Sequence, residues 1–130
     1  MLYHMHALIK IHAKNPKALD TEGLKDWVRT VIEHQKMEIV NGPFVTNVTD
    51  AGNEGPTGGC HIKTSHFAFH IWEETGLIQA DLYTCGVLDV QALVEDFLVF
   101  DPIHIEYAVI NREDTIQLVH RGEMFLDERG

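Results

Sequence analysis

The chain has 130 residues, a length that fits one domain spanning residues 1–130. Hydrophobic residues make up 45% of it and charged residues 23%, a composition that excludes a disordered tail and a membrane-embedded protein. Twenty Asp and Glu against ten Lys and Arg give a formal charge of -10, which predicts no nucleic-acid partner and favours small cationic ligands. With no signal peptide, no membrane-spanning run and only Cys60 and Cys85, we expect a cytoplasmic protein with reduced thiols.

The first half of the chain predicts a strand, a helix and a second extended region. Residues 2–12 alternate between apolar and polar side chains, the period of a strand with one buried face. Asp20 or Thr21 can cap a helix that ends near residues 34–36. Its apolar stripe consists of Leu24, Trp27, Val28, Val31 and Ile32. Residues 37–49 predict one or two short strands, interrupted at Gly42-Pro43.

A glycine-rich segment and two strands follow in the middle of the chain. Residues 50–59 contain four Gly and one Pro, which predicts a loop. Residues 61–72 are expected to form one strand and residues 77–84 another, joined by the tight link 73–76. Asp89 can then cap a second helix. The apolar face of this helix is expected to hold Val90, Leu93, Val94, Phe97 and Leu98.

The last third adds a strand at 103–110 and a short edge strand at 115–120, and residues 127–130 are expected to be frayed. The predicted order is therefore β-α-β-β-β-α-β. Hairpin-length links in the middle imply antiparallel pairing, and two one-faced helices can cover one side of the sheet. The sequence predicts an α+β two-layer sandwich, with a mainly antiparallel sheet and two helices on one face.

Reactive side chains gather in the middle of the chain. They are Thr57, Cys60, His61, Ser65, His66, His70, Glu74, Asp81 and Cys85. Taken singly, each has an ordinary structural role, since a lone Ser is not activated and a lone buried Cys is a small inert hydrophobe. A zinc site is one alternative, because His66, His70 and Cys85 are zinc ligands by type. They lack the close paired spacing of structural zinc sites, so we expect no metal here.

The order of these residues is more informative than their types. The segment from Thr57 to Glu74, followed by Ala80 to Gly86, resembles the signature of the short prokaryotic S-adenosylmethionine decarboxylases. In that family a Ser-Gly or Thr-Gly pair precedes a Glu-Ser-His step, then a His-Thr-Trp-Pro-Glu run and an Asp-x-Phe-Thr-Cys-Gly segment. The spacing fits without gaps from residue 57 to residue 86.

The resemblance implies that this chain cuts itself between Thr64 and Ser65. The Ser65 hydroxyl would attack the preceding carbonyl, and elimination and hydrolysis would leave a pyruvoyl group at position 65, which serves as the cofactor. His70 matches the processing histidine of the family, and Thr57 matches its assisting hydroxyl. Such chemistry needs a base near the serine and a donor for the oxyanion.

The same resemblance implies decarboxylation of S-adenosylmethionine for polyamine synthesis. The pyruvoyl ketone condenses with the substrate amine and accepts the electrons released with carbon dioxide. Cys85 matches the thiol that returns a proton to the substrate carbon, and Glu74 matches the acid that holds the ribose. His66 and Asp81 are also expected to bind substrate. Members of the family assemble as dimers, so a homodimer is expected.

Departures from the family pattern keep other functions open. Thr64 stands where the family has Glu, and Glu73 replaces the Pro of the Trp-Pro-Glu run. The adenine-stacking aromatic falls at Ala51, and base–aromatic stacking is worth about 1–3 kcal/mol. One alternative is therefore a decarboxylase of another amino acid, such as ornithine or arginine. Another is an uncleaved, non-catalytic paralogue that binds a nucleoside or a protein partner.

Overall fold

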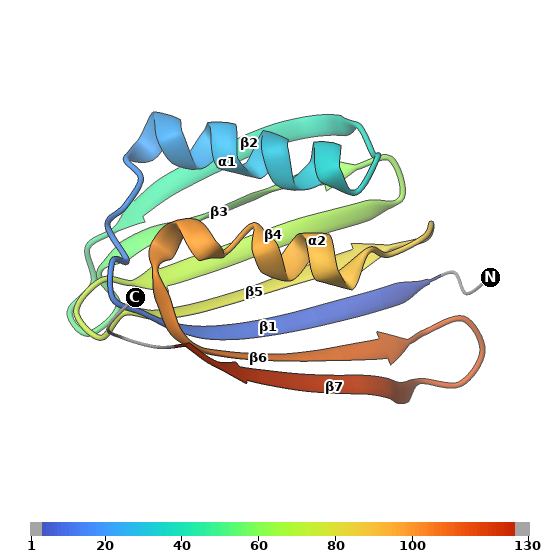
Figure 1. The fold of residues 1–130 in the computed structure, drawn as a ribbon. Helices are drawn as coiled ribbons and strands as arrows, with labels where there is room; N and C mark the ends of the chain where they lie inside the picture. Colours follow the sequence, from blue (N-terminus) through green and yellow to red (C-terminus); the bar gives the residue numbers. More distant parts are fainter. Residues whose placement is uncertain (1–3, 127–130) are drawn as a thin grey trace.

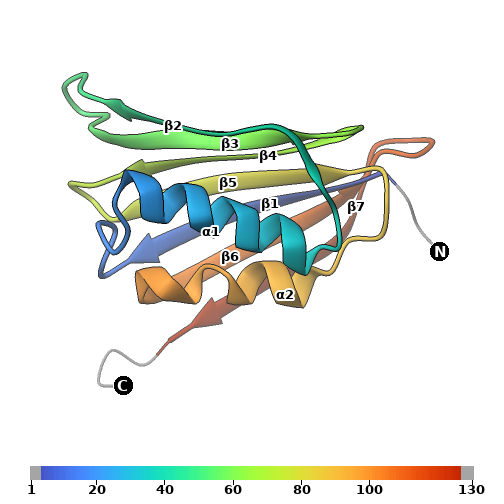
Figure 2. The same ribbon diagram turned by 90° about the horizontal axis from the view of Figure 1, so that it is seen from above.

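A computed structural model describes residues 4–126 and shows a single sheet of seven strands. The strand order is β2-β3-β4-β5-β1-β6-β7, and every neighbouring pair is antiparallel. Two helices lie on the same side of this sheet (Figures 1 and 2). The predicted α+β sandwich is therefore confirmed. The elements are β1 Met5–Ala13, α1 Thr21–His34, β2 Ile39–Val48, β3 Gly55–Ile62, β4 Ser65–Trp72, β5 Leu77–Thr84, α2 Val90–Glu95, the 3₁₀ helix η1 Leu98–Phe100, β6 Pro102–Asn111 and β7 Gln117–Phe125.

The first helix matches its prediction in both its ends and its buried face. Asp20 is the N-cap, and its carboxylate accepts a hydrogen bond of 2.8 Å from the Gly23 N–H. The helix ends at His34, and all five residues of the predicted apolar stripe are buried. Trp27 lies at the centre of the core, with the rings of Phe67, Phe69, Phe97 and Phe100 at centroid distances of 5.1 to 5.6 Å.

The second helix is shorter than predicted. Asp89 caps it as expected, accepting a hydrogen bond from the Ala92 N–H at 3.1 Å, but α2 ends at Glu95 and the separate turn η1 follows. Phe97 is fully buried, whereas Leu98 is 46% exposed. The placement of Leu98 on the buried face was therefore wrong, because the break in the helix turns this side chain outward.

The glycine-rich segment is a strand and not a loop. β3 begins at Gly55 and continues through Gly58 and Gly59 to Ile62. A Cβ at position 58 would lie 2.1 Å from the Phe44 carbonyl oxygen, and one at position 59 would lie 2.0 Å from the Phe67 carbonyl oxygen. These glycines therefore permit close contact with the flanking strands. Composition alone cannot distinguish a glycine-rich strand of this kind from a flexible glycine-rich loop.

Two other predicted strands differ in extent from the observed ones, and one of the two options for residues 37–49 is observed. A tight turn at residues 63–64 divides the predicted strand 61–72 between β3 and β4. β2 runs as one strand through Gly42-Pro43, where its register with β3 shifts. The predicted short edge strand extends to Phe125 as β7. The predicted fraying of residues 127–130 lies outside the described residues.

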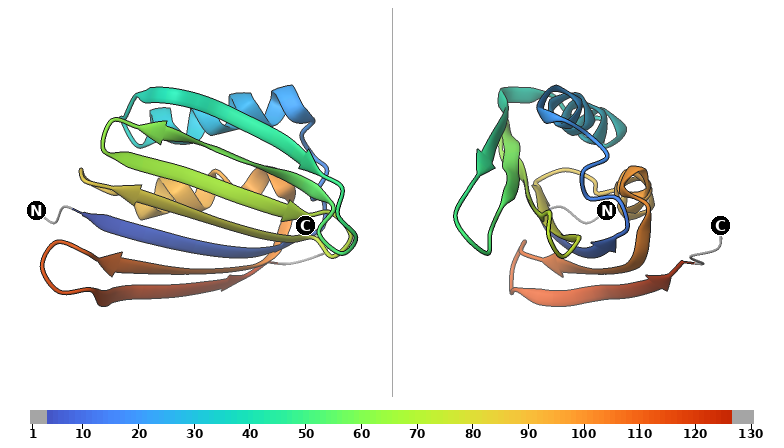
Figure 3. Two further views of the ribbon diagram at one scale, coloured as in Figure 1. Left: turned by 180° about the vertical axis from the view of Figure 1, so that it is seen from behind. Right: turned by 90° about the vertical axis from the view of Figure 1, so that its left-hand side faces the viewer.

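Among residues 4–126, no helix covers the opposite face of the sheet (Figure 3). In β1, Ala7, Ile9 and Ile11 are buried against the helices, while His6 and Leu8 point to the other side. We call this helix-free side the open face. Among the described residues, no helix has the length and apolar character needed to cross a bilayer.

Candidate functional site

Ser65 and Cys85 come together at one end of the sheet. Ser65 is the first residue of β4, directly after the turn at 63–64, and Cys85 directly follows β5. The antiparallel register pairs His66 with Tyr83 and so brings the start of β4 to the end of β5. The backbone N–H of Cys85 donates a hydrogen bond of 3.1 Å to Ser65 Oγ. The serine hydroxyl is therefore oriented by the backbone of the segment that carries the thiol.

Thr64, the residue before the 64–65 peptide bond, also contacts the segment that carries Cys85. Its Oγ1 is hydrogen-bonded to the Cys85 Sγ. The Gly86 N–H donates to Thr84 Oγ1 at 2.9 Å, which fixes the backbone on both sides of Cys85. Cys85 is partly exposed, whereas Cys60 is buried, and that burial raises the pKa of the Cys60 thiol to about 11. Cys85 is therefore the thiol available for chemistry.

A hollow of about 570 Å³ opens beside Ser65. It is lined by Val40, His61, Ile62, Lys63, Thr64, Ser65, His66, Tyr83 and Arg112. No Asp or Glu belongs to this lining, although the chain as a whole is acidic. The Arg112 guanidinium lies over the Tyr83 ring, 4.3 Å from its centroid. The hollow therefore offers a small region of cationic character next to the serine.

The remaining predicted catalytic and ribose-binding residues lie at the far end of the sheet. Thr57 and His70 are direct cross-strand partners in β3 and β4, and Thr57 Oγ1 donates to the Phe69 carbonyl at 3.3 Å. His70 is five residues along β4 from Ser65, a separation of about 16 Å along the strand. Glu74 is exposed in the turn after β4. One chain therefore does not bring these three residues to Ser65.

His70 is distinctive at this far end. Its ring packs edge-on against Trp72, with centroids 4.3 Å apart. Within residues 4–126, its Nε2 is the one buried side-chain nitrogen or oxygen that has no hydrogen-bond partner. A buried polar atom without a partner costs about 1–3 kcal/mol, so this nitrogen lacks an interaction that a functional arrangement would supply.

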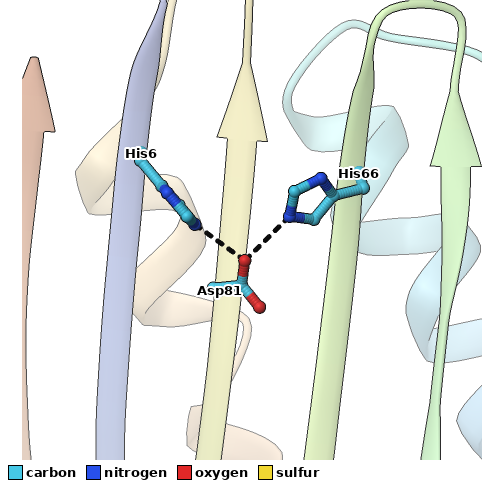
Figure 4. Close-up of side chains that lie close together, drawn as sticks. All are labelled: His6, His66 and Asp81. Atoms are coloured by element: carbon cyan, nitrogen blue, oxygen red, sulfur yellow. Dashed lines mark hydrogen bonds and ion pairs between the residues drawn. The ribbon is translucent and has the colours of Figure 1, made fainter. Parts of the chain in front are cut away.

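A cluster of three residues lies on the open face near the Ser65 end (Figure 4). His6 Nε2 and His66 Nε2 lie 2.7 and 2.9 Å from the same oxygen, Asp81 Oδ2. The sequence singled out His66 and Asp81 but not His6. The alternation of buried and exposed residues in the first strand could have identified His6. This residue lies on the side of β1 away from the core, and β1 pairs with β5, the strand of Asp81.

The zinc ligand set considered from the sequence is not assembled. His66 and His70 are four residues apart in one strand, about 13 Å along its axis. Cys85 Sγ is hydrogen-bonded to Thr64 Oγ1. These three residues therefore cannot share one metal ion within a single chain.

Comparison with known proteins gives a consistent result. Residues 5–113 match the sequence profile of a family described as S-adenosylmethionine decarboxylase. A relative from Picrophilus torridus, named S-adenosylmethionine decarboxylase proenzyme, is 32% identical over 65 residues, covering 48% of this chain and 50% of its own length. Proteins of the same name from Parasynechococcus marenigrum and Archaeoglobus fulgidus are 27% and 28% identical over 82 and 90 residues. These two matches cover 62% and 66% of this chain and 61% and 74% of the relatives. The matched segments thus span about half to three quarters of these relatives.

Proposed function

The chain belongs to the S-adenosylmethionine decarboxylase family, and from this premise we propose that it is a self-processing, pyruvoyl-dependent decarboxylase of S-adenosylmethionine that serves polyamine synthesis. The observation that carries the proposal is the contact between Ser65 and Cys85. Ser65 is the residue that would become the pyruvoyl group, and Cys85 is the residue that would donate a proton to the substrate. The Cys85 backbone N–H donates a hydrogen bond of 3.1 Å to Ser65 Oγ.

Self-cleavage begins at Ser65 Oγ. This oxygen attacks the Thr64 carbonyl carbon, and the amide bond between residues 64 and 65 becomes an ester. Elimination then removes the proton from the Ser65 Cα and breaks the bond between the Ser65 Cβ and its oxygen, which leaves the Thr64 carboxylate and a dehydroalanine at position 65. Hydrolysis releases ammonia and leaves a pyruvoyl group at residue 65. The Cys85 N–H that already donates to Ser65 Oγ holds this oxygen in place before attack.

The surroundings of residue 65 fit a pyruvoyl group. The residue lies at a junction between turn and strand, half-buried, on the wall of the 570 Å³ hollow. A pyruvoyl group there would join the substrate amine and supply the sink for the electron pair left when carbon dioxide departs. Cys85 Sγ then delivers a proton to the substrate carbon, and Thr64 Oγ1 orients the thiol beforehand. We assign His66, Asp81 and Glu74 to substrate binding.

A homodimer completes the site in this proposal. His70, Thr57 and Glu74 are about 16 Å or more from Ser65 in their own chain, so they can act on Ser65 only from a second copy. The open face offers a surface for this contact, because it is uncovered and exposes Leu8, Phe44 and Phe125. Two copies with antiparallel sheets would set the Ser65 end of one against the His70 end of the other.

Mass measurement on purified protein tests self-cleavage. The wild type is expected to give fragments 1–64 and 65–130, whose masses sum to the full chain plus water minus ammonia. Ser65→Ala is expected to remain intact. If the wild type stays full-length after prolonged incubation, the uncleaved alternative replaces the proposal. Release of carbon dioxide from S-adenosylmethionine, compared with ornithine and arginine, then tests the substrate.

A further inference from the structure

We propose that His6, His66 and Asp81 form a binding site for one divalent transition-metal ion of the zinc class. The three residues come from adjacent strands, β1, β4 and β5, and all point to the open face (Figure 4). His6 and His66 both lie opposite Tyr83 in the register, and Asp81 lies two residues further along the strand between them. The sheet therefore fixes the spacing of the three side chains.

The ligand atoms already converge. His6 Nε2, His66 Nε2 and one Asp81 oxygen all lie within 4.8 Å of one another. The two nitrogens are 2.7 and 2.9 Å from Asp81 Oδ2, whereas ligands of a tetrahedral zinc ion are separated by about 3.3 Å. Outward movement of the imidazoles by about half an ångström would admit the ion.

The donor set suits this class of ion. Two neutral imidazoles and one carboxylate are typical ligands of Zn²⁺, Co²⁺ and Ni²⁺, while Mg²⁺ and Ca²⁺ prefer oxygen ligands alone. Three protein ligands leave at least one coordination position for water or another ligand. His66 lines the hollow beside Ser65, and Asp81 lines a second hollow of about 500 Å³ on the open face. The free position can therefore face a ligand held in either hollow, so His66 and Asp81 would contact substrate through the ion.

A second group of potential ligands fits a metal less well. His104, Glu106 and Glu123 also lie within ligand distance of one another. Glu106, however, forms an ion pair of 2.8 Å with Arg121, and the group sits at the exposed edge of the sheet. Beside the group of His6, His66 and Asp81, the Arg112 guanidinium lies 3.3 Å from His6 Nδ1. This nitrogen is not one of the atoms that would bind the metal, because His6 would bind through Nε2. Coordination through Nε2 leaves the proton of the neutral His6 imidazole on Nδ1, so the Arg112 guanidinium must turn away from Nδ1 when the ion binds. Arg112 also adds positive charge near the ion, and both effects weaken binding.

Metal titration of untagged protein tests the proposal independently of self-cleavage and activity. After dialysis against a chelator, we expect one Zn²⁺ per chain by calorimetry, and a Co²⁺ complex with visible d–d absorption. His6→Gln, His66→Gln and Asp81→Asn are each expected to lower zinc affinity at least about tenfold. Arg112→Gln is expected to raise it several-fold, because a like charge is removed.

His34→Gln is the matched control. His34 pairs with Asp96 at 2.8 Å, and no third potential ligand joins them within residues 4–126, so its loss should leave zinc affinity unchanged. Absence of stoichiometric binding to the wild type overturns the proposal, and so does unchanged binding to the three ligand variants. Because Ser65→Ala retains all three ligands, zinc binding by this uncleaved variant would stand even if self-cleavage fails.

Discussion

The Cys85 backbone N–H donates to Ser65 Oγ at 3.1 Å, while the Cys85 thiol is engaged separately by Thr64 Oγ1. The two groups of one residue thus face two different partners. Because the backbone bond does not depend on the side chain, the proposed roles in self-cleavage and in decarboxylation can be separated by mutation.

Cys85→Ala is expected to cleave itself but to decarboxylate poorly. It keeps the N–H that holds Ser65 Oγ and loses the proton donor, so kcat should fall by about 10²- to 10⁴-fold. Intact mass reports cleavage, and carbon dioxide release reports catalysis. Cys60→Ala, a change in the core, should retain kcat. Failure of Cys85→Ala to cleave would assign the thiol to processing instead.

The two thiols should differ sharply in reactivity. Burial raises the pKa of Cys60 to about 11, so at pH 8 about one molecule in a thousand carries the thiolate, the reactive form. Cys85 is partly exposed. Iodoacetamide at pH 8 should therefore modify Cys85 in the native protein and both residues after denaturation, as read by peptide mass spectrometry. Equal native labelling of both would contradict the buried position of Cys60.

Gly59→Ala should destabilise the fold strongly. Its Cβ would meet the Phe67 carbonyl oxygen at 2.0 Å, and its φ of +152° is unfavourable for a side chain, so the free energy of unfolding should fall by at least about 2 kcal/mol. Gly52→Ala is the control, since its φ is +86° but no atom lies within 4 Å of the new Cβ. It should lose about 1 kcal/mol. Chemical denaturation of both variants in an uncleaved Ser65→Ala background measures their free energies of unfolding. Equal losses of stability would mean that contact with the neighbouring strand does not explain why position 59 needs glycine.

Periodicity predicted those parts of the fold whose burial is one-sided. The alternation of β1 and the apolar stripe of α1 each report a single buried face, and both predictions are confirmed within the described residues; residues 2 and 3 of the predicted strand lie outside them. The strand at Gly58 and Gly59 was missed because a glycine in close contact with a neighbouring strand has the same composition as a flexible loop. Leu98 was misplaced because nothing in the pattern marked the end of α2.

For the candidate site, the sequence supplied residue types and order but not their grouping. Ser65 and Cys85 meet because β4 and β5 form a hairpin, a pairing that the short link predicted. His70 looked equally close in the sequence, but one extended strand places it about 16 Å from Ser65. His6 entered the cluster with Asp81 only through the pairing of β1 with β5, which joins residues 75 apart in the chain.

The separation of Ser65 from His70 gives a test of the proposed dimer by complementation. Ser65→Ala and His70→Ala chains, expressed singly, should each remain uncleaved. When they are co-expressed with different tags and the mixed dimer is purified through both tags, one site contains Ser65 from one chain and His70 from the other. The His70→Ala chain should then be cleaved, while the Ser65→Ala chain stays intact.

The outcome depends on geometry that a single chain cannot supply. About 16 Å of strand separates the hydroxyl from the imidazole, and rotation of side chains cannot close that distance. Cleavage within the mixed dimer therefore requires that His70 act across the interface, where its unpartnered Nε2 would meet a hydrogen-bonding group. If the purified mixed dimer shows no cleavage although the wild type cleaves, His70 does not act between chains, and the proposed arrangement of two open faces is wrong.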